Sequence, residues 1–405
     1  MLDTNKIRKD FPILKIKSNN KPLIFFDNGA SSQKPKMVLD KINEVYETKY
    51  ANIHRGIYDL SQKATEAYED ARKKIQKFIN SKSEKEIIFV RGATEAINLV
   101  AESYGLNNLK KGDEIILSQM EHHSNIVPWQ LLRDKIGIKI NVLQINKNGD
   151  IDLTEFNKLL TKKTKLVSIL HVSNALGTIV PLKELISIAH KKKIPVFVDG
   201  CQSVPHMKVD VVNLDADFYC FSGHKIYGPT GIGVLYCKKK ILEKMTPYQG
   251  GGEMISKVTF NKTTYQDSPY KYEAGTPNIV GAIALGSAID YVTKINIEKI
   301  YEHEQNLLKY ATEKIKNLNE VKIIGNSKKK AGIISFVVKN THPNDVGVIL
   351  DNQGIAVRTG HHCCQPLMEF YIISSTVRAS FGVYNTFEEI DCFYDGLKNA
   401  INLLR

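Results

Sequence analysis

The chain has 405 residues, of which 42% are hydrophobic and 24% charged, an ordinary composition for a globular enzyme. Its net charge is +13, but the lysines are scattered and no RNA- or DNA-binding signature accompanies them, so no nucleic-acid partner is expected. No run of about 18 apolar residues offers a membrane span. The six cysteines are too sparse for a disulfide framework, which favours a reducing, cytoplasm-like compartment.

The N-terminal segment MLDTNKIRKDFPILK lacks the apolar core of a signal peptide. We therefore expect a mature protein of the cytoplasm. The alternative is a plastid-type organelle, if a targeting segment has been removed from a precursor.

Residues 65–240 alternate short β-branched runs with longer amphipathic segments such as TEAINLVAESYG and LKELISIAHKKK. The short runs predict strands at 86–90, 113–118, 139–145, 165–172, 194–199 and 216–222. Nearly continuous apolar strands separated by helices are typical of a parallel sheet that is covered on both faces. The sequence therefore predicts an α/β fold with a mainly parallel sheet.

After about residue 290 the pattern changes to long charged helices and a few strands, which predicts a smaller α+β domain. A chain of this length exceeds what one hydrophobic core usually supports. We expect a large domain of residues 16–289 and a small domain of residues 290–405, joined by residues 1–15.

Polar clusters follow five of the predicted strands: GAT, EHHSN, SNALG, DGCQS and SGHK. In open α/β sheets, ligands bind beyond the carboxyl ends of the strands. Because these clusters converge on one edge, the sequence predicts a large ligand site there.

Several residues in these clusters suit one cofactor. Lys225 has small neighbours that would confine its amine as a Schiff-base nucleophile, although it could be a surface lysine after a turn. Asp199 could pair with a protonated pyridine nitrogen or cap the next turn. Gln202 could donate to an oxygen on the same ring or be exposed.

Two more features complete the pattern. The Gly-Ala-Thr turn at 92–94 would offer backbone N–H groups and the Thr94 hydroxyl to an anion, unless the threonine is only a helix cap. His122 could stack on an aromatic cofactor and relay a proton, or be structural. The combination matches pyridoxal 5′-phosphate.

The motifs EHHSNIVPWQ, HVSNALGT, VDGCQS, FSGHKIYGPTGIG, YEAGTPN, RTGHHC and RASFGVYNT resemble those of SufS-type (group II) cysteine desulfurases. The resemblance runs from FPIL to the last predicted helix. It implies a fold-type I enzyme of the aminotransferase class V family that uses pyridoxal phosphate. Such an enzyme converts L-cysteine to L-alanine and transfers the sulfur as a persulfide for iron–sulfur cluster assembly.

The resemblance also implies roles for individual residues. Lys225 would bind the cofactor covalently, Asp199 would pair with its ring nitrogen, Gln202 with its ring oxygen, and His122 would stack on the ring. The phosphate would be held by Ala93, Thr94, Ser222 and His224. Thr276 would reach the phosphate bound in the neighbouring subunit, which implies a homodimer. The substrate carboxylate would be held by Asn174, Arg358 and Arg378.

The stretch RTGHHCC contains two adjacent cysteines. The resemblance makes Cys363 the sulfur acceptor, and where the family usually has alanine this chain has Cys364. In an extended loop, neighbouring side chains point to opposite sides, so only one thiol would face the cofactor. Consecutive residues cannot close a tetrahedron around zinc, and a vicinal disulfide would be strained, so no metal and no disulfide is expected.

Further expectations stay open. Either His361 or His362 would lower the pKa of the Cys363 thiol. The chain has Gly29 where the family more usually has alanine, which would affect local loop stiffness.

A protein of the SufE or SufU kind and a cluster-assembly scaffold are the implied partners. The alternatives are selenocysteine lyase, a kynureninase-like hydrolase, or a sulfur carrier without catalytic activity.

Overall fold

The computed structural model describes residues 2–405 and contains a seven-stranded sheet in the order β4-β10-β9-β8-β7-β5-β6. Its strands are β4 (Ile87–Val90), β5 (Glu114–Ser118), β6 (Lys139–Leu143), β7 (Thr164–Leu170), β8 (Val196–Asp199), β9 (Phe218–Ser222) and β10 (Gly233–Cys237). Strands β5 to β9 pair in parallel, and β10 is antiparallel to both of its neighbours. The predicted parallel α/β fold is confirmed, with its strands near the expected positions.

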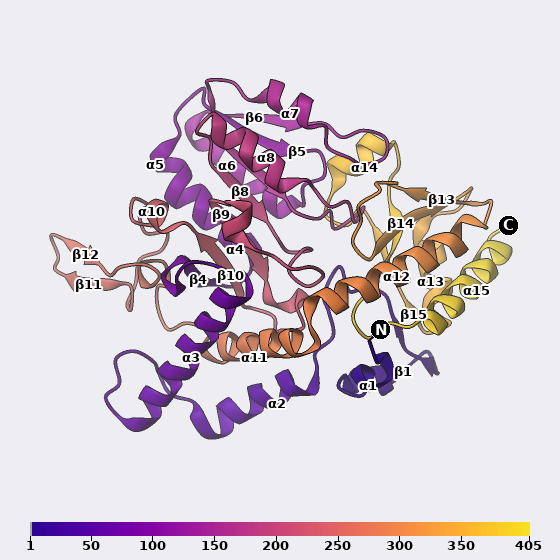
Figure 1. Cartoon of the computed structure of the whole chain (residues 1–405), viewed down its shortest axis with the longest axis horizontal. Helices are drawn as coiled ribbons and strands as arrows, with labels where there is room; N and C mark the ends of the chain where they lie inside the picture. The colour runs from indigo at the N-terminus through magenta and orange to yellow at the C-terminus, as the bar shows by residue number, and fades with distance from the viewer. Residues whose placement is uncertain (1) are drawn as a thin grey trace.

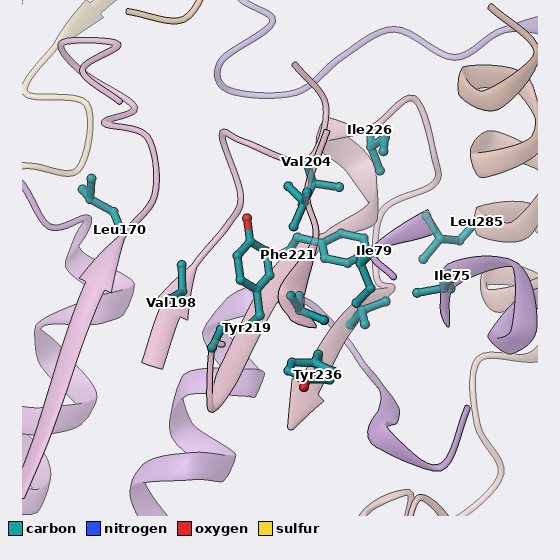
Figure 2. Close-up of a cluster of buried hydrophobic side chains, with 14 of the residues drawn as sticks. Ile75, Ile79, Leu170, Val198, Val204, Tyr219, Phe221, Ile226, Tyr236 and Leu285 are labelled. Carbon is teal, nitrogen blue, oxygen red and sulfur yellow. The ribbon is translucent and has the colours of Figure 1, made fainter. Parts of the chain in front are cut away.

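Helices cover both faces of this sheet (Figure 1). Because strand side chains alternate between faces, Phe221 of β9 packs toward α3 (Asp59–Phe78) and α11 (Ile279–Ile295), where Ile75 and Leu285 meet it (Figure 2). The opposite face packs against α4 (Ala93–Val100) and α6 (Val127–Ile136). This double cover explains why the central strands β8 and β9 are buried along their whole length.

A second, four-stranded antiparallel sheet follows in the order β13-β14-β17-β16. Its strands are β13 (Val321–Ile324), β14 (Ile333–Val338), β16 (Arg358–Gly360) and β17 (Thr376–Ser380). It packs with α12 (Ile297–Lys316), α13 (Pro343–Asp351) and α15 (Phe387–Leu403) around a separate core. The Thr386 and Glu389 side chains form a capping box that fixes the start of α15.

The remaining elements include α8 (Leu182–Lys191), which packs against the main core, and several shorter helices and strands. The shorter ones are α1 (Thr4–Arg8), β1 (Lys17–Ser18), β2 (Lys21–Pro22), β3 (Ile24–Phe25), α2 (Lys36–Glu44), α5 (Leu106–Asn108), α7 (Leu153–Leu159), α9 (Val211–Leu214), α10 (Lys239–Leu242), β11 (Ile255–Val258), β12 (Thr263–Tyr265), β15 (Ile355–Ala356) and α14 (Gln365–Tyr371). The β11–β12 hairpin projects from the seven-stranded sheet at the end far from α15 (Figure 1). Within residues 2–405, no helix has the length and apolar character needed to cross a membrane.

The predicted domain limit at residue 289 falls inside α11, which continues to Ile295. Asn296, with φ of +82°, ends α11 and caps α12. The N-terminal segment also belongs with the four-stranded sheet, because β3 pairs in parallel with β15 and Asp27 bridges to Ser380. We propose that the division into two domains lies at Asn296, with residues 24–27 assigned to the smaller one.

Candidate functional site

A cavity of about 270 Å³ lies at the carboxyl ends of β7, β8 and β9. It is lined by all of the predicted site residues except Thr276: Ala93, Thr94, His122, Asn174, Asp199, Gln202, Ser222, His224, Lys225, Arg358, Cys363 and Arg378. The convergence of strand ends that the sequence predicted therefore exists in the structure.

Lys225 ends a short 3-10 turn, Gly223–Lys225, that directly follows β9. The turn is packed tightly, since a Cβ on Gly223 would lie 3.0 Å from the carbonyl oxygen of Ile232. The carbonyl oxygen of His224 accepts hydrogen bonds from Lys34 Nζ at 2.9 Å and from the Ser32 backbone at 3.1 Å. Burial lowers the pKa of Lys34 to about 8. These contacts fix the backbone from which Lys225 enters the cavity.

Asp199 and Gln202 lie on the floor of the cavity. Asp199 is 5% exposed, and its Oδ1 accepts a hydrogen bond of 2.9 Å from the Cys201 backbone. Gln202 Nε2 donates to the Gly29 carbonyl at 2.5 Å, while its buried Oε1 has no partner within residues 2–405. A buried carboxylate and an unpaired amide oxygen both require a polar partner, which a bound ring with polar substituents would supply.

The start of α4 forms one end of the cavity. The Ala93 backbone donates to Ser222 Oγ at 2.9 Å, and a Cβ on Gly92 would lie 3.2 Å from the same oxygen. First-turn N–H groups of a helix carry the positive end of its dipole and bind anions. Burial, together with Lys225 and Lys34, lowers the pKa of His224 to about 4, so its imidazole is neutral.

His122 is held in one tautomer. Its Nδ1 accepts a hydrogen bond of 3.1 Å from the Ser124 backbone and lies 2.8 Å from Ser124 Oγ. The ring proton is therefore on Nε2. Burial, reinforced by Lys225, lowers the pKa of His122 to about 4. The imidazole ring of His122 is neutral at physiological pH, and its Nε2 carries the one proton that the ring can donate.

Arg378 lies in β17 and is 1% exposed. Its Nη1 donates to the Asn174 carbonyl and its Nη2 to Asp27 Oδ1, both at 2.9 Å, while its buried Nε has no partner within residues 2–405. Arg358, the neighbour of Arg378 across β16 and β17, lies 3.7 Å from Asp27 Oδ2. Two guanidinium groups share one carboxylate, so the cavity keeps a net positive charge suited to an anionic substrate group.

Gly29 has a consequence beyond loop stiffness. A Cβ at this position would lie 3.2 Å from Arg378 Cζ and 3.2 Å from Ser380 Oγ. The guanidinium cannot easily shift, because Asp27 and the Asn174 carbonyl hold it on two sides. Glycine therefore leaves room around the buried arginine.

The two adjacent thiols point in different directions, but not for the predicted reason. The backbone is not extended here: His362 and Cys363 have φ of +52° and +56°, a left-handed turn. The turn is held by a hydrogen bond of 2.8 Å from the His123 backbone to the Cys363 carbonyl, and by one of 2.7 Å from Asn174 Nδ2 to the His362 carbonyl. The expectation of an extended loop was wrong, because these contacts stabilise the left-handed conformation.

Cys363 is half-buried and lines the cavity, whereas Cys364 is completely buried. The Cys364 thiol donates a hydrogen bond of 3.0 Å to Asn174 Oδ1. Because Asn174 Nδ2 also binds the His362 carbonyl, both ends of this amide hold the cysteine turn. Cys364 thus fixes Asn174 as well as filling space.

The two histidines of this turn differ in environment. His362 is 3% exposed, and its Nε2 lies 2.7 Å from Thr376 Oγ1. Burial, with Arg378 nearby, lowers the pKa of His362 to about 2, so it carries no positive charge near Cys363. His361 is exposed, and its Nδ1 accepts a hydrogen bond of 3.2 Å from the Cys363 backbone. Of the two rings, that of His361 contacts the Cys363 backbone, whereas that of His362 is bound to Thr376.

The contrast between the thiols predicts selective alkylation. Burial raises the pKa of Cys364 to about 12, so it stays a protonated thiol at pH 8. Iodoacetamide should modify Cys363 and spare Cys364 in the folded protein, as measured by peptide mass spectrometry. Denatured protein, in which both become modified, is the control. Modification of Cys364 at the rate of Cys363 before unfolding would contradict this assignment.

Sequence reasoning did not single out Cys201, which lines the cavity, or Asp27, which pairs with a lining residue. Cys201 lines the cavity beside Asp199, and burial raises the pKa of its thiol to about 12. It lies in the DGCQS cluster, but a single buried thiol gives no sequence signal. Asp27 pairs with Arg378 from a segment far away in the chain, and only its place in DNGAS could have suggested it.

Residues 24–393 match the family described as aminotransferase class-V. The chain belongs to this family. The membership confirms the resemblance at the level of the class-V family, the fold class, and pyridoxal phosphate as the cofactor, while the narrower SufS-type group stays a prediction. The cavity fits that cofactor, since it combines a lysine, a buried carboxylate, a buried amide side chain and a helix start.

Relatives within the class-V family are named as desulfurases. The chain is 48% identical over 405 residues to a protein named cysteine desulfurase of Escherichia coli K12, covering 100% of both chains. It is 48% identical over 389 residues to a protein of the same name from Synechococcus elongatus, covering 96% of this chain but spanning only 62% of that relative. The solved apo structure of a cysteine desulfurase from Thermococcus onnurineus NA1 has a TM-score of 0.93 and 42% identity, covering 100% of this chain and 98% of that one.

Proposed function

We propose that the chain is a cysteine desulfurase that converts L-cysteine to L-alanine and holds the sulfur as a persulfide on Cys363. One observation carries the proposal: a half-buried thiol lines the same cavity as Lys225 and Arg378, while its neighbour Cys364 is turned away. The names of the relatives support the same reaction.

All of the proposed cofactor contacts except that of Thr276 would be made by residues that line the cavity. Lys225 would bind pyridoxal phosphate covalently, Asp199 would pair with the ring nitrogen, and Gln202 Nε2, which has a second hydrogen, would donate to the ring oxygen. His122 would stack on the ring. The phosphate would be held by Ala93, Thr94, Ser222 and His224. When bound, the cofactor supplies the electron sink needed to break a bond at the substrate carbon.

The remaining residues act on the substrate. Arg378, with Arg358 and Asn174, would hold the carboxylate, and the Lys225 amine would move the proton from the α carbon. The Cys363 thiolate would attack the substrate sulfur, so that an S–S bond forms as the C–S bond breaks. The electron pair of that bond stays with the carbon fragment, which gains a proton, relayed by the neutral His122, and leaves as alanine.

Removal of Arg378 should weaken substrate binding. A charge-assisted hydrogen bond to a carboxylate contributes about 1.5–3 kcal/mol, so Arg378→Ala should lower kcat/KM roughly tenfold or more, mainly through KM. Arg358→Ala should have a smaller effect, because that side chain is 41% exposed. Steady-state kinetics with an unchanged cofactor spectrum measures both. A KM that stays at the wild-type value in Arg378→Ala would remove this residue from the carboxylate site.

We further propose a homodimer. Thr276 lies not in this cavity but in a separate one of about 280 Å³, beside Arg91 and Glu95. Within one chain it does not line the cofactor cavity, so it would serve the phosphate only in a neighbouring copy. Analytical ultracentrifugation tests whether two chains pair, and an active monomer would refute the homodimer.

The proposed desulfurase function also includes the fate of the sulfur. Cys363 would transfer it to an acceptor protein of the SufE or SufU kind, for iron–sulfur cluster assembly in the cytoplasm.

The decisive experiment is the measurement of alanine from L-cysteine, with and without reductant. Cysteine desulfurase activity should give alanine in both conditions, and reductant should release the bound sulfur and sustain turnover. No alanine from protein that shows bound cofactor would refute the proposal. The alternative function, selenocysteine lyase, would use the same residues. Parallel assays with L-cysteine and L-selenocysteine therefore decide between the two activities.

A further inference from the structure

The edge of the seven-stranded sheet opposite the cofactor cavity is rich in lysine. Strands β7 and β8 run in parallel and are neighbours, so their amino ends lie together at this edge. Lys162, Lys163 and Lys165 lie at the start of β7, and Lys191–Lys193 precede β8. All of these lysines are exposed.

The charge of this cluster is not neutralised. None of these lysines takes part in the ion pairs formed within residues 2–405. Lys165 Nζ donates to the Lys162 carbonyl at 3.1 Å, and Lys192 Nζ donates to the carbonyls of Asn157 and Leu160 at 3.0 Å. These contacts hold two ammonium groups in place without removing their charge. Closely spaced like charges repel one another, so a bound anion would stabilise the arrangement.

A cavity of about 600 Å³ lies between the segment that leads into β7 and the segment that leads into β8. Four lysines line it, Lys162, Lys165, Lys192 and Lys193, and no acidic residue does. The adjacent Glu114 carboxylate accepts a hydrogen bond of 2.7 Å from Thr161 Oγ1, so it is engaged beside the cavity. The volume is in the range of sites for small molecules.

We propose that this cavity binds a small molecule that carries two or more phosphate groups. Four ammonium groups around one cavity match several closely spaced negative charges, which a single carboxylate does not provide. Lysine binds phosphate as a point charge on a flexible stem, so no fixed bidentate geometry is required. The cavity lies at the amino ends of the strands, away from Lys225, so occupancy should leave the cofactor site intact.

The test uses the holoenzyme and isothermal titration calorimetry with inorganic tripolyphosphate. The variant Lys162→Gln/Lys165→Gln/Lys193→Gln keeps Lys192, which holds the loop backbone. The matched control Lys322→Gln/Lys328→Gln/Lys329→Gln removes the same charge from exposed lysines of the smaller sheet region. Exposed charge pairs contribute modestly one by one, so loss of three should weaken binding roughly tenfold or more. The control should bind as the wild type does, and added salt should weaken wild-type binding.

Three outcomes would overturn the proposal. One is absence of tripolyphosphate binding by the wild-type holoenzyme. Another is an equal loss of affinity in both variants, which would show attraction by net charge alone. The last is much tighter binding of poly-L-glutamate or a single-stranded oligonucleotide than of tripolyphosphate through these lysines, which would make the edge a docking surface for a polymer. Alanine formation by the Lys162/Lys165/Lys193 variant should equal that of the wild type.

Discussion

Replacement of Cys363 by serine should abolish sulfur transfer from L-cysteine, whereas Cys364→Ala should keep most of it. The Cys363 thiol lines the cavity, while the Cys364 thiol is buried against Asn174 Oδ1, and its pKa is raised to about 12. Mass spectrometry after a single turnover should find an addition of roughly 32 Da, one sulfur atom, on the peptide that contains Cys363.

The Cys363→Ser variant has an internal control. It should still bind pyridoxal phosphate with an unchanged spectrum, because no proposed ring contact uses this thiol. It should also keep cleavage of L-selenocysteine, whose weaker carbon–selenium bond depends less on an enzyme nucleophile. If the extra sulfur is found on Cys364, or if Cys364→Ala is the inactive variant, the roles of the two thiols have been exchanged.

Replacement of Lys225 by alanine should remove the covalent cofactor link and lower turnover by about 10²–10⁴-fold, the contribution of a positioned proton-transfer group. Wild-type protein should absorb at about 420 nm and give a borohydride-reducible adduct. Lys34→Ala is the matched control, since Lys34 is the buried lysine bound to the His224 carbonyl. It should retain the adduct. If the adduct persists in Lys225→Ala but disappears in Lys34→Ala, the covalent link is formed by Lys34, and its assignment to Lys225 is wrong.

Much of the cavity could be predicted because it follows from strand direction. Asp199, Ser222 and Lys225 directly follow or end apolar strands, and the carboxyl ends of parallel strands share one edge. The double-sided apolar pattern of β7 to β9 was sufficient to predict both the sheet and the edge at which the cavity lies.

The contacts between distant segments could not be predicted. The pairing of Asp27 with Arg378, and that of Asn174 with Cys364, join segments whose proximity depends on how two sheets pack. No local pattern encodes such a pairing. The left-handed turn at Cys363 escaped prediction for the same reason, since hydrogen bonds from His123 and Asn174 stabilise it.

The end of α11 at Ile295, six residues beyond the predicted domain limit at 289, was hard to predict for a different reason. The apolar pattern of α11 continues past residue 290 without a proline, and the break is made by the single residue Asn296. An asparagine in a charged stretch is a weak signal for the end of a helix, even though asparagine tolerates a positive φ.

The parallel pairing of β3 with β15 also sets an order of assembly during synthesis. Ile24 leaves the ribosome early, but its partner Ile355 emerges only after every strand of the seven-stranded sheet. Domains generally fold as units as the chain emerges, so the larger sheet can form while β3 still lacks its partner. Cys363 and Arg378 are translated later still. A nascent chain therefore carries Lys225 on a completed sheet before Cys363 and then Arg378 are added, so the cavity gains these two side chains only after the sheet that supports it has formed.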